Sequence, residues 1–181
     1  MTLHKNIVLI GMPGSGKTTI GKLLKERLDI DFCDIDEYIE KKENKSIPEI
    51  FKSGEDYFRQ IEAKVVEEVS KIYPQIISTG GGVVKNHKNI DTLKRNGIIF
   101  FINRPLELIL SDVETKNRPL LKEGKDKLYS LFKERYGLYK EYCHYEILNI
   151  GELEEVLNEI QRIIINIQGS ESVEITYNQW T

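Results

Sequence analysis

The sequence predicts an α/β protein of three layers, with a five-stranded parallel sheet between helices on both faces. Three observations support this fold class. Short apolar runs alternate with stretches of helical periodicity along the chain, which is typical of repeated β-α-β units. One run, at 97–102, is almost continuously apolar, as in a strand buried on both faces. The first run leads directly into a glycine-rich turn and a helix.

The expected elements follow from these patterns. Each expected strand is a short apolar run: Ile7–Ile10, Asp31–Cys33, Gln75–Thr79, Gly97–Ile102 and His144–Ile150. Each expected helix has apolar residues every three or four positions: 19–28, 36–42, 47–52, 55–72, 86–95, 105–113, 126–142 and 153–167. Ser46 is the expected N-cap of the third helix, with Pro48 in its first turn.

Two segments lie outside this regular pattern. The segment from Glu114 to Lys125 is polar and contains the helix breakers Asn117, Pro119 and Gly124, so we expect a mobile loop. The last residues show no clear period. We therefore expect one domain over residues 1–168 and a C-terminal tail of unknown role over 169–181.

Composition is that of an ordinary soluble globular protein. Hydrophobic residues make up 40% and charged residues 30%, and the net charge of −3 gives no reason to expect a nucleic-acid partner. No apolar run reaches the length of a membrane span, and the first strand begins too early for a signal peptide. We expect a cytoplasmic monomer with no membrane partner.

The cysteines and histidines give no sign of redox or zinc chemistry. Cys33 and Cys143 are far apart, which favours a reduced compartment and a packing role for both. His4, His87 and His144 are scattered, and none has a partner at the spacing of zinc ligands.

The glycine-rich turn is the strongest functional signal. Residues 11–18 read GMPGSGKT and fit the phosphate-binding pattern G-x-x-x-x-G-K-[ST] between a strand and a helix. Glycines let backbone N–H groups approach phosphate oxygens, and the helix N-terminus adds partial positive charge. In this pattern Lys17 reaches the β- and γ-phosphates and Thr18 binds Mg²⁺. The alternative is a chance glycine-rich turn, which the flanking strand and helix disfavour. The predicted nucleotide-binding residues are Gly14, Ser15, Gly16, Lys17, Thr18 and Thr19.

Three further segments suggest chemistry, and each also has a purely structural interpretation. Asp34 and Asp36 leave the second strand together, where one carboxylate can approach Mg²⁺ and the other can orient or deprotonate a hydroxyl. They can equally be acidic residues at a helix N-terminus. Arg59 and Glu62 are three apart on a helix, so they form either a guanidinium held for a carboxylate or a weak surface pair. The glycines 80–82 bring N–H groups to a ligand or form only a turn.

Together, in this order and spacing, these segments resemble the shikimate kinase family. The resemblance extends to Arg118-Pro119-Leu120-Leu121 and to Arg135 with Leu138-Tyr139, and covers the chain from about the first strand to the last helix. It implies a P-loop kinase architecture like that of the nucleoside monophosphate kinases, with substrate-binding helices at about 34–62 and a mobile lid at about 112–125. It also implies phosphorylation of the 3-hydroxyl of shikimate by ATP, with Mg²⁺, in aromatic amino-acid biosynthesis.

The resemblance implies roles for residues around the substrate. Asp34 is expected near Mg²⁺, directly or through water, with Ser78 in the same shell. Asp36 is expected on the substrate hydroxyls. Arg59 and Arg135, together with the glycines, are expected to bind the shikimate carboxylate. The glycines meant are Gly80, Gly81 and Gly82.

The catalytic residues implied by the resemblance are Lys17, Asp36 and Arg118. Arg118, from the lid, is also expected to contact the ATP phosphates. Two positions depart from the family pattern. Ser111 stands where the family usually has an arginine that contacts the nucleotide, and Gly137 stands where it has proline.

Other functions remain open on the sequence alone. Another small-molecule kinase, such as a gluconate or nucleoside monophosphate kinase, is disfavoured by the acidic pair and the glycine triplet. A GTPase-like switch would need Asp-x-x-Gly after the third strand and Asn-Lys-x-Asp, and both are missing. An inactive binding homologue is disfavoured because the charged residues of an active enzyme are present.

Overall fold

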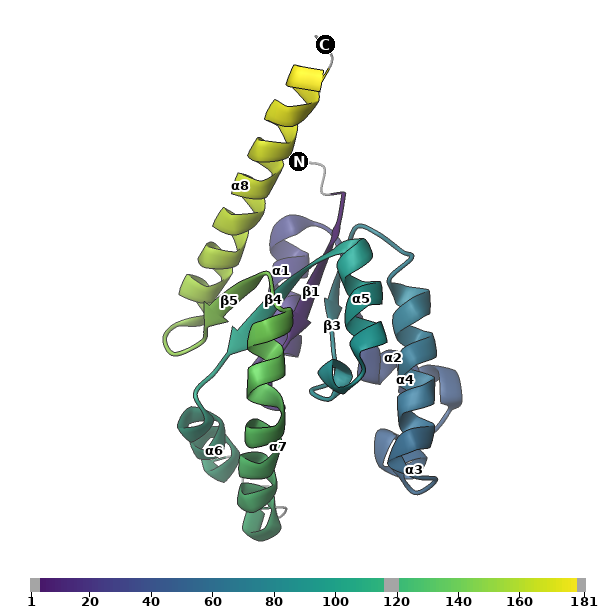
Figure 1. Ribbon diagram of the computed structural model, residues 1–181. Helices are drawn as coiled ribbons and strands as arrows, with labels where there is room; N and C mark the ends of the chain where they lie inside the picture. The colour runs from purple at the N-terminus through teal and green to yellow at the C-terminus, as the bar shows by residue number, and fades with distance from the viewer. Residues whose placement is uncertain (1–3, 116–120, 179–181) are drawn as a thin grey trace.

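The computed structural model describes residues 4–115 and 121–178. At its centre is the predicted five-stranded parallel sheet, in the order β2-β3-β1-β4-β5 (Figure 1). The strands are β1 (Asn6–Ile10), β2 (Asp31–Asp34), β3 (Gln75–Ser78), β4 (Gly97–Asn103) and β5 (Tyr145–Leu148). The predicted fold class is confirmed.

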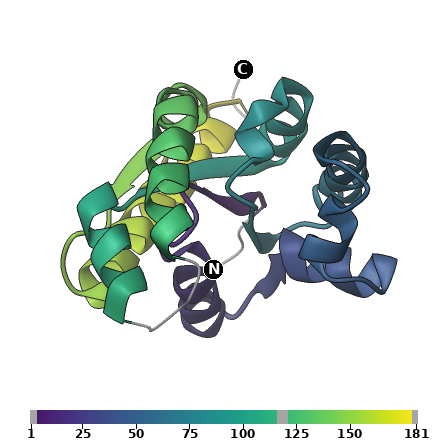
Figure 2. The same ribbon diagram turned by 90° about the horizontal axis from the view of Figure 1, so that it is seen from below.

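Helices cover both faces of the sheet. On one face lie α1 (Lys17–Leu28) and α8 (Leu153–Asn178). On the other lie the 3₁₀ helix η1 (Val83–Lys85), α5 (His87–Arg95) and α7 (Leu121–Tyr142), with α6 (Leu106–Thr115) beside α7. Beyond β2 and β3, a lobe is formed by α2 (Ile35–Glu43), α3 (Ile47–Phe51) and α4 (Glu55–Val69) (Figure 2).

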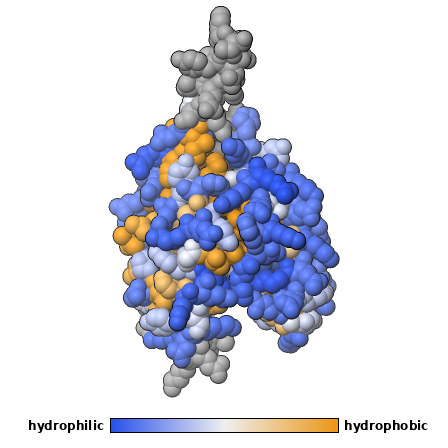
Figure 3. All heavy atoms as spheres, in the orientation of Figure 1, coloured by the Kyte–Doolittle hydropathy of each residue, from blue (hydrophilic) through white to orange (hydrophobic). Residues whose placement is uncertain are grey.

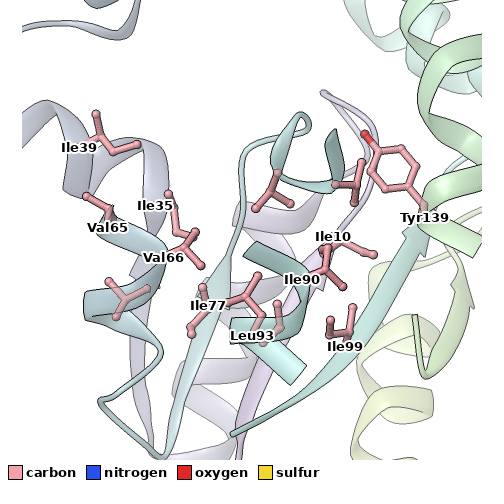
Figure 4. Packing of buried hydrophobic residues seen from close by; sticks show 14 of the residues in the cluster. Ile10, Ile35, Ile39, Val65, Val66, Ile77, Ile90, Leu93, Ile99 and Tyr139 are labelled. Atoms are coloured by element: carbon pink, nitrogen blue, oxygen red, sulfur yellow. The ribbon is translucent and has the colours of Figure 1, made fainter. Parts of the chain in front are cut away.

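The core consists of two apolar clusters, one on each face of the sheet. Successive residues of β1 alternate between them: Ile7 and Leu9 pack with α1 and α8, whereas Val8 and Ile10 pack with α4, α5 and α7. Figure 4 shows the second cluster, where side chains of α4 and α5 meet those of the strands. The outward faces of α4 and α5 are hydrophilic (Figure 3), as expected for amphipathic helices.

The register of the sheet brings the ends of the central strands together. Leu9 pairs with Ser78, and Ser78 pairs with Asp34, so the glycine-rich turn and the two acidic residues leave the same edge. Thr79 secures this edge, because its N and Oγ1 both donate to the Leu9 carbonyl, at 3.1 and 2.9 Å. Figure 2 views the molecule from this side, where parallel α/β sheets usually bind ligands.

Most predicted elements are confirmed within a few residues, including the cap of α3. Ser46 and Glu49 form a capping box, and Pro48 lies in the first turn. The predicted loop over 114–125 is wrong at both ends, because α6 continues to Thr115 and α7 already begins at Leu121. Residues 116–120, which include Arg118, lie outside the described residues.

The C-terminal prediction is also wrong. The last helix was expected to end at 167, but α8 continues to Asn178. Most of the expected tail is therefore helical, and it extends past the sheet (Figure 1). The sequence from Leu153 to Asn178 contains no proline and one glycine, Gly169. A single glycine costs a helix only about 1 kcal/mol relative to alanine, so it does not end α8. Among the helices in the described ranges, none has both the length and the apolar character to cross a membrane.

Candidate functional site

The phosphate loop follows β1 and wraps around the amine of Lys17. Gly14 and Gly16 have φ values of 82° and 95°, a region that residues with a side chain rarely enter. The Lys17 Nζ donates to the carbonyls of Gly11 and Met12 at 3.0 and 2.8 Å, and α1 begins at Lys17 itself. The loop and the helix N-terminus thus form the anion-binding arrangement that the sequence predicts.

Lys17 is buried, with 7% of its surface exposed. Burial lowers the pKa of Lys17 to about 8, while the carboxylates of Asp36 and Asp34 act in the opposite direction. An ammonium group held in this environment gains from any further negative charge brought beside it. The loop is therefore suited to a highly charged anion such as a triphosphate.

Oxygen atoms from three elements meet at the start of α1. The Thr18 Oγ1 donates to Asp34 Oδ2 at 2.8 Å and lies 3.4 Å from the Ser78 Oγ. The other Asp34 oxygen, Oδ1, accepts from the N atoms of Asp36 and Glu37 and so caps α2. The interpretation of Asp34 as an acidic residue at a helix N-terminus is therefore confirmed, and its other oxygen is directed at Thr18.

This oxygen cluster fits Mg²⁺ bound largely by phosphate and water. Mg²⁺ prefers oxygen ligands and commonly uses one or two protein groups beside substrate phosphates. Within the described residues, no three or more His, Cys, Asp or Glu side chains gather as in an all-protein metal site. Thr18, Asp34 and Ser78 are the residues suited to such an ion.

Asp36 is close enough to both Lys17 and the arginine of α4 for their charges to act on it. Burial and the neighbouring Asp34 raise the pKa of Asp36, whereas Lys17 and Arg59 oppose the rise. A Cβ placed on Gly80 would lie 2.9 Å from Asp36 Oδ1, so any larger residue there would displace this carboxylate. A carboxylate with a raised pKa next to a phosphate site is a candidate proton acceptor.

The Arg59–Glu62 pair is buried, which rules out the interpretation as a weak surface pair. Arg59 Nη1 lies 2.8 Å from Glu62 Oε2, and Glu62 is completely buried. Burial raises the pKa of Glu62, and the charge of Arg59 opposes this. Glu55, one turn earlier, accepts from Arg59 Nη2 at 3.2 Å. Two carboxylates therefore orient one guanidinium.

The glycine triplet lies directly against this guanidinium and the phosphate loop. A Cβ on Gly82 would be only 2.1 Å from Arg59 Nη2, and a Cβ on Gly81 would be 2.8 Å from Pro13 Cδ. The Tyr139 hydroxyl donates to the Gly81 carbonyl and fixes the triplet from α7. The triplet is therefore more than a turn, since it allows three elements to meet.

A chain of ion pairs joins the two predicted substrate arginines. Lys85 Nζ lies 2.9 Å from Glu55 Oε1 and 3.1 Å from Glu134 Oε1, and Arg135 Nε lies 3.2 Å from Glu134 Oε2. We call this set the ion-pair chain; its members in order are Glu62, Arg59, Glu55, Lys85, Glu134 and Arg135. Arg135 is only 7% exposed, so α4 and α7 each present a largely buried guanidinium.

Of the predicted site residues, Thr19 and Arg118 are placed differently from the rest, and Ser111 and Gly137 are the two positions that depart from the family pattern. Thr19 is exposed in the first turn of α1. Ser111 is exposed on α6, where its Oγ donates to the Leu108 carbonyl at 3.0 Å. Arg118 lies outside the described residues. Gly137 has open space around it and does not interrupt α7.

Several polar contacts of the site were not predicted. The spacing of Glu55 and Arg59, four apart on a helix, could have indicated their pairing. Lys85 and Tyr139 carry no such local signal, because each contacts residues far away in the chain. Asn149, which contacts the phosphate loop from the end of β5, was also missed.

Known proteins are similar to this chain in both sequence and fold. A family model for shikimate kinase matches residues 13–165. A shikimate kinase of Clostridium botulinum (strain Alaska E43 / Type E3) is 49% identical over 164 residues, which are 91% of this chain and 99% of the relative. A shikimate kinase from Acinetobacter baumannii, solved in complex with shikimate, superposes with a TM-score of 0.81 and 38% identity, over 90% of this chain and 93% of its own. The Aquifex aeolicus shikimate kinase gives a TM-score of 0.77 at 38% identity, over 91% and 98% of the two chains.

Proposed function

The chain belongs to the shikimate kinase family, and from this premise we propose that it transfers the γ-phosphoryl group of ATP to the 3-hydroxyl of shikimate. One observation supports the proposal: the charges of the buried Lys17 amine and of the Arg59 guanidinium both act on the Asp36 carboxylate, which packs against Gly80. This supports a phosphate site at Lys17, a carboxylate site at Arg59, and Asp36 as the proton acceptor near both.

The proposed reaction needs positioning and charge more than covalent help from the protein. The bond between the γ-phosphorus and the oxygen bridging to ADP breaks, and a new bond forms to the substrate hydroxyl oxygen. The hydroxyl proton passes to Asp36 and from there to solvent. The raised pKa of Asp36 supports this role, because a more basic carboxylate accepts a proton more readily.

Lys17 is proposed to neutralise the negative charge on the phosphate oxygens, and the family resemblance implies the same role for Arg118. The Lys17 amine is already oriented by two loop carbonyls, so little reorganisation accompanies its contact with phosphate oxygens. Mg²⁺ held near Thr18, Asp34 and Ser78 would neutralise phosphate charge when bound. The roles of Arg118 and of the metal ligands are proposals.

The substrate carboxylate is proposed to lie between Arg59 and Arg135. Planar guanidinium groups bind carboxylates through paired N–H···O bonds. Glu62 and Glu55 orient Arg59, while Glu134 contacts Arg135. Backbone groups of the glycine triplet complete the proposed pocket.

The test is ADP release by the purified protein, measured with shikimate, with gluconate and without an acceptor. We expect rapid release with shikimate only, and shikimate 3-phosphate as the product. Equal release without an acceptor, or faster release with gluconate, would contradict the proposal.

A matched pair of variants tests the pocket. Arg59→Met should raise the KM for shikimate more than about ten-fold and change the KM for ATP less than two-fold, since one charge-assisted contact is worth about 1.5–3 kcal/mol. Arg95→Met, at the end of α5, removes the same kind of charge away from the pocket and should change neither value. A rise in the KM for ATP equal to that for shikimate would disprove the assignment of Arg59.

A further inference from the structure

A buried asparagine follows β5, and the function above gives it no role. Asn149 is 3% exposed, and its Nδ2 donates to the Ser15 carbonyl of the phosphate loop at 2.9 Å. Its Oδ1 is also buried and has no hydrogen-bond partner among the described residues. Desolvating an amide is unfavourable unless its hydrogen bonds are replaced, so the hydrogen bond from the Asn149 side chain to Ser15 is a specific feature of this site.

The contact fixes the direction of one peptide group in the loop. The Ser15 carbonyl and the Gly16 N–H belong to the same planar trans peptide and point in opposite directions. Holding the carbonyl toward Asn149 therefore keeps the Gly16 N–H on the opposite side. A Cβ on Gly16 would lie 3.0 Å from Asn149 Nδ2, so the amide packs closely against this peptide.

Asn149 is in turn held by β4 and α6. Its N donates to the Asn103 carbonyl at 2.9 Å, and its own carbonyl accepts from Arg104 Nη1 at 3.1 Å. The same guanidinium contacts Asp112 of α6, with Nη2 to Oδ2 at 2.8 Å and Nε to Oδ2 at 3.0 Å. Arg104 thus ties the β5–α8 connection to α6, which lies beside it in Figures 1 and 2.

We propose that Asn149 is a positioning residue for nucleotide binding and that Arg104 holds it in place. Asn149 keeps the Ser15–Gly16 peptide in the orientation that the loop needs before a nucleotide arrives. Donors fixed in advance bind an anion more tightly than donors that must first reorient. Removing Asn149 therefore weakens ATP binding and leaves shikimate binding unchanged, because no contact links Asn149 to Arg59, Arg135 or the glycine triplet within the described residues. The inference rests on the proposed function.

The test uses Asn149→Leu, which keeps the branched shape but removes both polar atoms. We expect the Kd for ATP from calorimetry and the KM for ATP to rise about ten-fold, with the KM for shikimate within two-fold of the unsubstituted protein. Arg104→Met should act in the same direction, by about three-fold. The double variant should lose less ATP affinity than the two single effects multiplied, because both act through one contact.

Two control variants show how a loss of stability alone affects the Kd for ATP. Asn89→Leu replaces an asparagine of α5 that is 2% exposed and whose side-chain hydrogen bond is with Asn86. Arg27→Met removes an arginine that, like Arg104, bridges two elements, here from α1 to Glu154 of α8 at 2.7 Å. Both controls should lower the melting temperature without changing the Kd for ATP.

Three results would overturn the inference. One is a Kd for ATP that stays constant in Asn149→Leu while the melting temperature falls as in the controls. Another is an equal rise in the KM values for ATP and shikimate, which would indicate general loosening. If Asn149→Leu does not fold, Arg104→Met decides: an ATP-selective rise supports the inference, and an unchanged Kd for ATP overturns it.

The same measurements separate this inference from the proposed function. If the unsubstituted protein bound no ATP, both the proposed function and the role of Asn149 would be contradicted. Tight ATP binding by the unsubstituted protein, together with unchanged binding by the variants, would remove only the role of Asn149.

Discussion

Replacing Gly82 with alanine tests the substrate pocket through one methyl group. The methyl carbon would lie 2.1 Å from Arg59 Nη2 and 2.6 Å from Arg59 Cζ, whereas an ordinary contact needs at least 3.4 Å. The guanidinium must therefore move by more than about 1 Å. Gly82 has φ −99° and ψ 0°, which residues with a side chain also adopt, so the backbone itself is not strained.

The displaced guanidinium loses its alignment with both its carboxylate partners and the substrate. Its distance to the buried Glu62 is 2.8 Å, so a shift of this size weakens or breaks that ion pair. Loss of one charge-assisted hydrogen bond to the shikimate carboxylate is worth about 1.5–3 kcal/mol. This corresponds to a rise of about 10- to 150-fold in the KM for shikimate, with the KM for ATP unchanged.

Steady-state kinetics with each substrate varied in turn measures the KM for shikimate and the KM for ATP separately. Gly137→Ala is the matched control, because a Cβ there meets nothing within 4 Å and the residue lies inside α7. It should leave both KM values unchanged and stabilise the fold by about 1 kcal/mol, the helix preference of alanine over glycine. A Gly82→Ala enzyme whose KM for shikimate changes less than two-fold would refute the reasoning.

Two further predictions concern charge. Asp36→Asn should lower kcat more than ten-fold. Because its pKa is raised in the fold, Asp36 contributes stability that is present below its unfolded pKa, near 3.8, and lost as pH rises through the folded pKa. The asparagine variant should therefore melt at a higher temperature at neutral pH, and scanning calorimetry should find the difference gone near pH 3; a lower melting temperature at pH 7 would contradict this. The lowered pKa of Lys17, about 8, predicts that binding of ATP takes up about half a proton at pH 8, measurable by calorimetry in buffers of different ionisation enthalpy. Lys17→Arg, which stays charged, should take up none, and zero uptake by the unsubstituted protein would count against the shift.

Local sequence patterns were sufficient for most of the fold because its elements depend on local periodicity and caps. Ser46 with Glu49 illustrates this, since a capping box is written in four consecutive residues. The two wrong predictions have different origins: helix breakers such as Gly124 indicated the loop over 114–125, and the lack of a clear period indicated the tail over 169–181. Gly124 and Gly169 both lie inside helices, because a single glycine costs less than the packing and hydrogen bonding of a long helix returns.

The site was predictable where chemistry follows from a contiguous motif, as for Lys17 and Thr18. Spacing also indicated that Arg59 and Glu62 face each other, but it could not show that Glu62 is completely buried. Burial depends on elements that are distant in sequence. Asn149 shows the limit most clearly, because it contacts Ser15 across 134 positions and no pattern in its neighbourhood marks it as polar core.

The ion-pair chain described above holds one predicted substrate arginine near each of its ends, Arg59 beside the terminal Glu62 and Arg135 as the other terminus. It starts at the anionic, buried Glu62, alternates in sign through α4 and η1, and stops at the cationic Arg135 on α7. A carboxylate placed between Arg59 and Arg135 would turn this open string of alternating charges into a closed loop. The acid group of the acceptor would then connect the two helices directly, whereas with a neutral analogue the ion pairs of this chain would connect α4 and α7 through Lys85.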